Sequence, residues 1–281
     1  MPNFRFLLKV SRPRFWIYIF GPFIVGLAAA ASTKSDLLDW RSGIFAIYFL
    51  FPANLLIYGV NDIFDYETDR LNTKKTGYET LVRPEHWLTL GIAIAAFNIP
   101  FIILAAIVST HVILGLAAFL FFSIAYSAPP IRAKTKPFLD SAFNILYILP
   151  GVFAYKMIGG EYPPIEIIAA GALWTAAMHA YSAIPDIKAD REARLSTIAT
   201  VLGPRATHIF CIACYAASTA FAYPYISWLA AVLGFVYIAM MTASIIFSNS
   251  RGVFTVYKTF PLINAASGFA LFWFVALHKF F

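Results

Sequence analysis

The chain has 281 residues, of which 60% are hydrophobic and only 12% are charged. Soluble domains carry about 25% charged residues, so a soluble protein this apolar would lack the polar side chains to cover its surface. The composition therefore excludes a soluble protein and predicts an all-α protein with several membrane-spanning helices in the lipid bilayer. The net charge of +7 would suggest nucleic acid in a soluble protein, but basic cytoplasmic loops explain it here, and we expect no nucleic-acid partner.

Hydrophobic runs and the residues that interrupt them predict a bundle of nine transmembrane helices. The runs cover roughly residues 15–31, 43–60, 88–108, 112–127, 141–157, 165–183, 206–223, 227–247 and 260–278. The first, fourth and fifth runs are short for a bilayer crossing, which takes about 20 apolar residues. No linker or appended soluble region interrupts this pattern, so we predict one transmembrane domain over residues 1–281.

Lysine and arginine are distributed unequally between the connecting segments. If the N-terminus is cytoplasmic, 17 of the 21 basic residues fall on the cytoplasmic side. They are Arg5, Lys9, Arg12, Arg14, Arg70, Lys74, Lys75, Arg83, Arg132, Lys134, Lys136, Lys188, Arg191, Arg194, Arg205, Arg251 and Lys258. The positive-inside rule then predicts a cytoplasmic N-terminus, an external C-terminus and an odd number of spans.

A cluster of acidic residues follows the second predicted span. Asp62, Asp65 and Asp69 lie at i, i+3 and i+7, so a continuous helix would place them on one face, with Asn61 beside Asp65. Like charges at this spacing repel each other, and a bound divalent cation would remove that cost. Mg²⁺ is the predicted ion, because it is usually held by one or two carboxylates together with substrate phosphates.

A second acidic pair, Asp186 and Asp190, follows the sixth predicted span. Of the 14 acidic residues, seven lie in the two clusters: Asp62, Asp65, Glu67, Asp69, Asp186, Asp190 and Glu192. The predicted topology places both clusters at the cytoplasmic mouth of the bundle. Two acidic clusters, each after a span and before a long basic loop, also hint at an internal duplication.

Basic residues accompany both acidic clusters. Arg70 and Lys74 follow the first, Lys188 and Arg191 lie within or beside the second, and a third loop contributes Arg132 and Lys134. Carboxylates that hold Mg²⁺, with arginine and lysine around them, are what a diphosphate group requires. The basic loops could instead serve only as topology signals.

The aromatic content is compatible with a lipid tail on the diphosphate. The chain has 28 Phe, 15 Tyr and 6 Trp. Aromatic faces stabilise a nearby cation, and an allylic carbocation is one such cation. Lipid-facing positions account for most or all of these residues, so the aromatic content alone does not distinguish a lipid-modifying site from an ordinary membrane protein.

These motifs resemble the UbiA-type intramembrane prenyltransferases. Asn61-Asp62-x-x-Asp65-x-x-x-Asp69 resembles the first signature of that family, and Asp186-x-x-x-Asp190 is similar to the second. The loop from Tyr126 to Lys134 and the pair Arg12-Pro13 also fit, and the resemblance covers essentially the whole chain. It implies Mg²⁺-dependent transfer of a prenyl group from a prenyl diphosphate to a lipophilic acceptor.

The resemblance also assigns roles to individual residues. It implies that Asn61, Asp62, Asp65 and Asp69 hold one Mg²⁺ and that Asp186 and Asp190 hold a second. The residues expected to bind the diphosphate are Arg70, Lys74, Arg132, Lys134 and Arg191, and the candidate catalytic residues are Lys188, Tyr126 and Tyr181. The two tyrosines would face the reacting allylic carbon.

Two phrases favour one branch of the family. Tyr126-Ser-Ala-Pro-Pro resembles lycopene elongases and chlorophyll synthases, and the segment around Pro185, with residues 196–200 beyond it, looks more like lycopene elongases. The best interpretation is therefore prenylation of lycopene or a related carotenoid, with an aromatic quinone precursor or a chlorophyllide-like acceptor as the alternative. Arg194 departs from this branch, where glycine is expected. The predicted location is the bacterial or archaeal cell membrane, with the site open to the cytoplasm.

Two other classes of membrane protein share some of these features. A membrane transporter is the main alternative, but the acidic residues cluster on one side instead of lining a pathway. A CDP-alcohol phosphotransferase would carry an Asp-Gly-x-x-Ala-Arg signature, which the sequence lacks.

Two smaller features stay open. Cys211 and Cys214 form a C-x-x-C pair that is better explained by packing than by zinc, since four ligands would be needed. His179, seven residues before Asp186, is a candidate general base or else a buried structural histidine.

Overall fold

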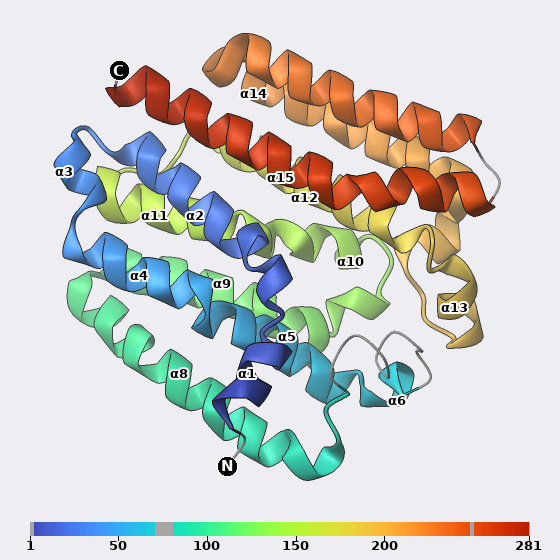
Figure 1. Ribbon diagram of the computed structural model, residues 1–281, viewed down its shortest axis with the longest axis horizontal. Helices are drawn as coiled ribbons and strands as arrows, with labels where there is room; N and C mark the ends of the chain where they lie inside the picture. The colour runs from blue at the N-terminus through green and yellow to red at the C-terminus, as the bar shows by residue number, and fades with distance from the viewer. Residues whose placement is uncertain (1–2, 71–80, 248–249, 281) are drawn as a thin grey trace. The chain divides into compact units, whose positions relative to one another are not determined.

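The structure is a computed structural model that describes residues 3–70, 81–247 and 250–280 (Figure 1); within these ranges, the side chains of residues 68, 69 and 250–255 are not described. Every regular element in the described ranges is an α-helix or a short 3-10 helix, as the predicted all-α class requires. The chain forms two compact units, Met1–Arg132 with Leu149–Glu161, and Ala133–Ile148 with Tyr162–Phe281. The single functional domain predicted over residues 1–281 stays a prediction.

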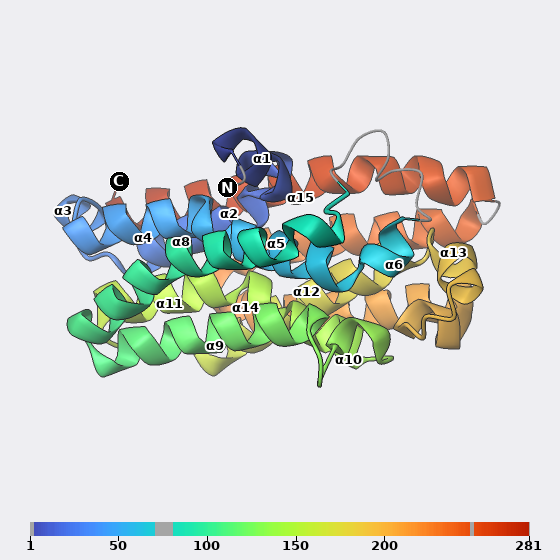
Figure 2. The ribbon, with the colours of Figure 1, turned by 90° about the horizontal axis from the view of Figure 1, so that it is seen from below.

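The first unit is a set of packed apolar helices that contains the first acidic cluster. Its elements are α1 (Phe4–Val10), η1 (Pro13–Phe15), α2 (Ile17–Ala30), α3 (Lys34–Leu37), α4 (Trp40–Leu50), α5 (Pro52–Phe64), α6 (Tyr66–Asp69), η2 (Pro84–His86), α8 (Trp87–Val108), α9 (Thr110–Ser127) and α11 (Leu149–Gly159). Pro52 opens α5, as proline commonly does at a first helical position. The side chain of Ser109 caps α9, so that α8 turns directly into α9 and the two run side by side (Figure 2).

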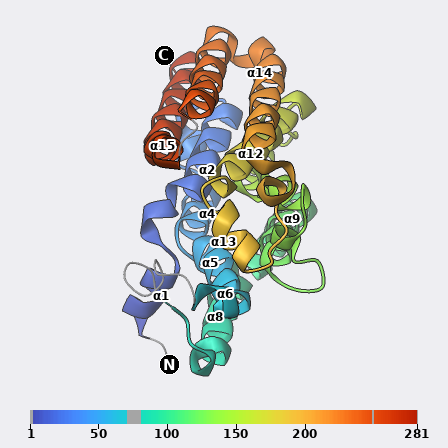
Figure 3. The ribbon, with the colours of Figure 1, turned by 90° about the vertical axis from the view of Figure 1, so that its right-hand side faces the viewer.

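The second unit contains the second acidic cluster. Its elements are η3 (Ala133–Thr135), α10 (Leu139–Ala142), η4 (Phe143–Tyr147), α12 (Ile165–Ala183), α13 (Ile187–Glu192), α14 (Ile198–Ile246) and α15 (Ser250–Phe280). The short α13 follows the end of α12, and Thr197 then caps the start of α14 (Figure 3).

Helix α14 is interrupted near its start at Gly203 and, near its middle, by a sharp break at Ser227. Its 49 residues would extend about 74 Å if straight, far more than the roughly 30 Å of a bilayer core. The backbone leaves the helical region at Ser227 (φ 44°, ψ −124°), and the chain doubles back there (Figure 1). The two halves then pack so closely that a Cβ on Gly234 would overlap Thr219 Oγ1.

Seven helical segments in the described ranges are long and apolar enough to cross a membrane. The predicted spans 206–223 and 227–247 both fall within α14 and are separated by its break at Ser227. The predicted span 165–183 coincides with α12, which is not among the seven. An integral membrane protein is thus supported, while the count of nine helices stays a prediction.

Candidate active site

The first acidic cluster lies where α5 ends. Asp62 is in the last turn of α5, and Asp65 follows the helix as its C-terminal cap, with φ −105° and ψ 1°. The separate helix α6 begins at Tyr66, so the continuous helix assumed for this motif is interrupted at Asp65. The side chain of Asp69 lies outside the described residues. Both described carboxylates are buried, at 3% exposure for Asp62 and 8% for Asp65.

Asp62 forms an ion pair with Arg12 from the N-terminal segment. Arg12 Nη2 donates to Asp62 Oδ1 at 2.6 Å, and the guanidinium lies 4.8 Å from the centre of the Tyr58 ring. Arg12 has a left-handed backbone (φ 51°) at the turn between α1 and η1. The N-terminal segment thereby brings a cation and the end of α5 together across 50 residues of chain.

Asp65 is held by an amide and by a second arginine. Asn61 Nδ2 donates to Asp65 Oδ2 at 2.8 Å and lies 3.2 Å from Ser127 Oγ at the end of α9. Arg132 Nη2 lies 3.6 Å from Asp65 Oδ1 and donates to the carbonyl oxygen of Phe64 at 3.1 Å. The structure therefore brings together Asn61, Asp65 and Arg132 of the predicted site.

The second cluster is built on the single turn between Asp186 and Asp190. The backbone N–H of Asp190 donates to the carbonyl oxygen of Asp186 at 2.8 Å, so both side chains belong to the same helical turn. Thr197 Oγ1 donates to Asp190 Oδ2 at 3.4 Å. Partial burial, followed by the charge of Asp186, raises the pKa of Asp190 to about 6.

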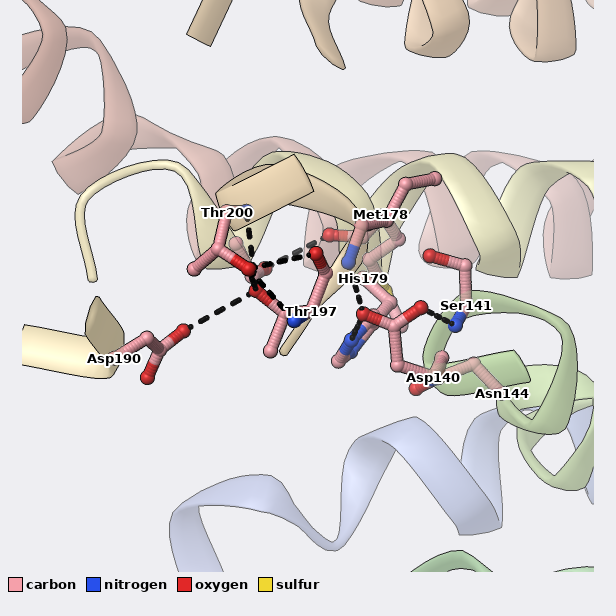
Figure 4. A network of polar contacts seen from close by, with 10 residues as sticks. Asp140, Ser141, Asn144, Met178, His179, Asp190, Thr197 and Thr200 are labelled. Carbon is pink, nitrogen blue, oxygen red and sulfur yellow. Dashed lines mark hydrogen bonds and ion pairs between the residues drawn. The ribbon is translucent and has the colours of Figure 1, made fainter. Parts of the chain in front are cut away.

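A buried carboxylate supports the start of α14 behind this cluster (Figure 4). Asp140 is fully buried and accepts the backbone N–H of Ile198 at 2.7 Å and that of Ser141 at 2.8 Å. His179 Nε2 lies 3.7 Å from Asp140 Oδ2. Neither Asp140 nor its contact with His179 was predicted; the only available signal was that aspartate is rare in so apolar a segment.

Most of the other predicted site residues lie in exposed or half-buried positions. Arg70 is exposed and pairs with Glu67 at 3.1 Å. Arg191 is exposed and donates to the carbonyl oxygen of Thr200 at 3.2 Å, and Lys188 is also exposed. Lys134 lies in η3 and Tyr126 in the last turn of α9, both half-buried. Lys74 lies outside the described residues.

Tyr181 is enclosed within the second unit. Its ring is fully buried and makes edge contacts with Phe260 and His208, at centroid distances of 5.1 and 5.8 Å. Its hydroxyl donates to Ser244 Oγ at 3.4 Å. Its predicted position facing an allylic carbon stays a prediction, and these contacts favour a packing role.

The donor set fits Mg²⁺ only in combination with other ligands. The described residues contain no group of three His, Cys, Asp or Glu side chains that could hold a metal by themselves. Each cluster nevertheless offers carboxylate oxygens, and Mg²⁺ commonly completes its shell with substrate phosphates and water. The burial of the Asp62 and Asp65 carboxylates favours a cation in the first cluster, because a bound ion would stabilise their ionised form.

Comparisons with known proteins identify the family. The model of the UbiA prenyltransferase family matches residues 19–252. The chain belongs to this family. It is therefore an intramembrane prenyltransferase, as the resemblance of its motifs implied, and the family match favours an enzyme over the transporter alternative.

Two curated relatives and a solved structure add detail. The chain is 46% identical to a lycopene elongase/hydratase of Haloferax volcanii over 77% of this chain and 72% of that protein. It is 40% identical to a lycopene elongase/hydratase of Haloarcula japonica over 94% of this chain and 88% of that protein. A UbiA homologue of Archaeoglobus fulgidus, bound to DMAPP and Mg²⁺, shares the fold with a TM-score of 0.68 at 19% identity, over 95% of this chain and 98% of that one.

Arg12 is the site residue whose role the sequence did not predict. Arg12-Pro13 was noted only as part of the family resemblance, and its pairing with Asp62 depends on a contact between distant parts of the chain. A single arginine before the first span is indistinguishable in sequence from the topology signals Arg5 and Arg14 beside it.

Proposed function

We propose that this UbiA-family enzyme transfers a C5 prenyl group from dimethylallyl diphosphate to lycopene or a closely related long polyene. The observation that carries the proposal is the 40–46% identity to two lycopene elongase/hydratases, over 77% or more of this chain. The motif phrases around Tyr126 and Pro185 point to the same branch.

The described carboxylates and cations suit this reaction. In the proposal, Asn61, Asp62 and Asp65 hold one Mg²⁺ together with Asp69, and Asp186 and Asp190 hold a second. The bound ions supply positive charge to the leaving diphosphate. Arg132, with its guanidinium already beside Asp65, is placed to bind diphosphate oxygens, and we assign the same task to Arg70, Lys74, Lys134, Lys188 and Arg191.

The residues of the chain have three tasks in the mechanism. The basic side chains hold the diphosphate, whose bridging oxygen keeps the electron pair when the allylic C–O bond breaks. The carboxylates would hold the ions that stabilise the negative charge on this leaving group. The apolar helices exclude water from the carbocation until the acceptor alkene attacks it. A proton is then lost, or water adds, to complete the product.

We further propose nine transmembrane helices, a cytoplasmic N-terminus and a site that opens to the cytoplasm in an archaeal or bacterial cell membrane. The distribution of basic residues and the break of α14 at Ser227 support this arrangement.

The acceptor is tested by supplying membranes that contain the protein with Mg²⁺ and each donor–acceptor pair. Lycopene with dimethylallyl diphosphate should give products heavier by one or two C5 units in mass spectrometry. Activity only with a long polyprenyl donor and a hydroxybenzoate, naphthoate or homogentisate ring would reject the carotenoid assignment. It would leave the prenyltransferase assignment intact.

A further inference from the structure

Asp140 and His179 lie beside each other in the second unit, which also carries the second acidic cluster (Figure 4). Asp140 comes from the short helix α10, and His179 comes from the second-last turn of α12, the helix that leads to Asp186. Their facing atoms, Asp140 Oδ2 and His179 Nε2, lie 3.7 Å apart. The proposed reaction ends in a proton transfer, and the sequence leaves open whether His179 is its general base or a structural histidine.

The carboxylate of Asp140 is fixed in place. It is fully buried, and each oxygen accepts a backbone N–H, Oδ1 from Ser141 and Oδ2 from Ile198. A buried carboxylate is tolerated when such donors surround it, and the same donors prevent it from turning. The orientation of Asp140 toward the imidazole is therefore set before any substrate binds.

His179 is the more accessible partner. Its side chain is 18% exposed, whereas its neighbours Met178 and Ala180 are buried. It lies seven residues before Asp186, about two helical turns along the chain. It therefore lies on the segment that leads into the second acidic cluster.

The other histidine of this unit's interior is held differently. His208 is 2% exposed, with Nδ1 2.7 Å from the carbonyl oxygen of Pro204 and Nε2 2.9 Å from Ser244 Oγ. Because a carbonyl oxygen only accepts, Nδ1 carries the hydrogen and Nε2 accepts from Ser244. Both ring nitrogens are committed to structure, which makes His208 a suitable control.

We propose that His179 is the proton acceptor that completes prenyl transfer, and that Asp140 is the positioning residue that orients it and stabilises its protonated form. A partly exposed imidazole backed by a fixed carboxylate is the arrangement of a general base. The inference rests on the proposed function, since it needs a carbocation that forms beside this cluster.

The proton transfer follows formation of the new C–C bond. When the acceptor alkene attacks the prenyl carbon, a C–C bond forms and the acceptor becomes a tertiary carbocation. A neighbouring C–H bond then breaks, its electron pair closes a C=C bond, and the proton goes to Nδ1 of His179. The imidazolium directs its Nε2–H toward Asp140 Oδ2. In the hydrated product, water attacks the cation instead and His179 takes one proton of that water.

The experiment compares His179→Gln with wild type in membranes supplied with Mg²⁺, lycopene and dimethylallyl diphosphate carrying ¹⁸O in its bridging position. Reversible C–O cleavage moves the label to non-bridging oxygens and reports ionisation, while mass spectrometry of the carotenoids reports completed transfer. We expect product formation to fall about 100-fold or more, as for loss of a general base, while isotope exchange continues. Asp140→Asn keeps an oxygen to cap Ile198 and should show the same split, more weakly.

The control variant His208→Gln should lower the thermal stability and leave the ratio of exchange to product unchanged. A parallel loss of exchange and product in His179→Gln would overturn the proposal, because it would indicate a role in donor binding, ionisation or folding. Undiminished product formation would overturn it as well.

An error in the proposed acceptor can be distinguished from an error in the proposed role of His179. If wild type ignores lycopene and prenylates homogentisate, the proposed acceptor is wrong, and the same ratio measured on the homogentisate product still decides the role of His179. A wild-type protein that prenylates neither compound would overturn both proposals.

Discussion

Asp62 illustrates how a buried carboxylate in the first cluster is paired with an arginine from a distant segment. Its partner Arg12 is 15% exposed and Asp62 only 3%, so water cannot replace the guanidinium if it is removed. Breaking a buried ion pair from one side typically costs about 3–5 kcal/mol, because the remaining charge is left uncompensated.

We therefore predict that Arg12→Ala lowers the free energy of unfolding in detergent by about 3 kcal/mol without Mg²⁺. Added Mg²⁺ should recover part of this loss, since the ion supplies charge to Asp62. Thermal unfolding with and without Mg²⁺ measures both effects. Arg14→Ala, at an exposed position two residues away, is the matched control and should behave like wild type. Equal Mg²⁺ responses in Arg12→Ala and wild type would argue against metal binding at Asp62.

Removing the charge of Arg12 should lower the stability, but removing the charge of Asp190 should not. Burial and the charge of Asp186 raise its pKa to about 6, above its ordinary value of 3.8, so folding disfavours its ionised form. The folded protein binds more protons between these two pKa values, and stability is lost as the pH rises through that window.

Asp190→Asn should accordingly be at least as stable as wild type at pH 7.5 without metal, and no more stable at pH 3.5. Its Mg²⁺-dependent turnover should be lost, because a ligand is missing. Unfolding at the two pH values and an activity assay measure these outcomes, with Glu192→Gln, at an exposed position, as the control. A large loss of stability at pH 7.5 would contradict the argument from charge.

At the scale of elements, the crossing of α2 and α11 depends on two glycines. A Cβ placed on Gly26 would overlap the carbonyl oxygen of Gly151, which is backbone and cannot move aside. Small residues at such crossings let membrane helices approach closely.

Gly26→Ala should therefore destabilise the first unit by about 1–3 kcal/mol, as overpacking commonly does. Gly43→Ala in α4 is the matched control, because no atom lies within 4 Å of the added Cβ and alanine favours a helix by roughly 0.5–1 kcal/mol. Unfolding in detergent measures both variants. Similar stabilities for the two would mean that the helices separate at little cost.

Lycopene elongases are expected to have glycine at the position of Arg194. The backbone at the end of α13 explains why glycine suits this position. The N–H of Leu195 donates to the carbonyl oxygen of Asp190, and that of Arg194 to Arg191, which together form a Schellman motif. This motif requires a left-handed residue after the cap, and Arg194 has φ 55°. The departure of Arg194 from the branch is thus a matter of backbone geometry at an exposed turn.

Arg194→Gly should stabilise the protein by about 1 kcal/mol, because glycine adopts this conformation without the steric cost that arginine bears. Ala193→Gly, at the adjacent position with φ −81°, should bring no gain. Thermal unfolding distinguishes the two, and the carotenoid products of Arg194→Gly should match those of wild type. A change of acceptor in this variant would show that Arg194 also contributes to specificity.

At the scale of the whole molecule, the topology is the open question. The predicted cytoplasmic N-terminus and external C-terminus follow from 17 of 21 basic residues on one side. In a variant without Cys211 and Cys214, a cysteine at Thr76 should react with reagents only from the cytoplasmic side, and one at Lys279 only from outside. Labelling of both positions from the same side would contradict nine spans. Thr76 itself lies outside the described residues.

The sequence by itself determined the class, the family and the positions of the acidic motifs. Hydrophobic run lengths depend only on local composition, which is why the predicted span 165–183 coincides with α12. Motif wording is also local, and it led to the family that the comparisons confirm. The interruption at Asp65 was missed, because the spacing of the carboxylates fits a continuous helix equally well.

Only the tertiary structure decided which residues serve these motifs. Arg12 reaches Asp62 across 50 residues, and Asp140 reaches Ile198 across 58, and no local pattern encodes either contact. Tyr181 and His179 are two residues apart on α12, yet one is enclosed by Phe260 and His208 while the other faces Asp140. Successive helical residues point about 100° apart, so neighbours in sequence belong to different surroundings, and packing against other elements determines which of them is available for chemistry.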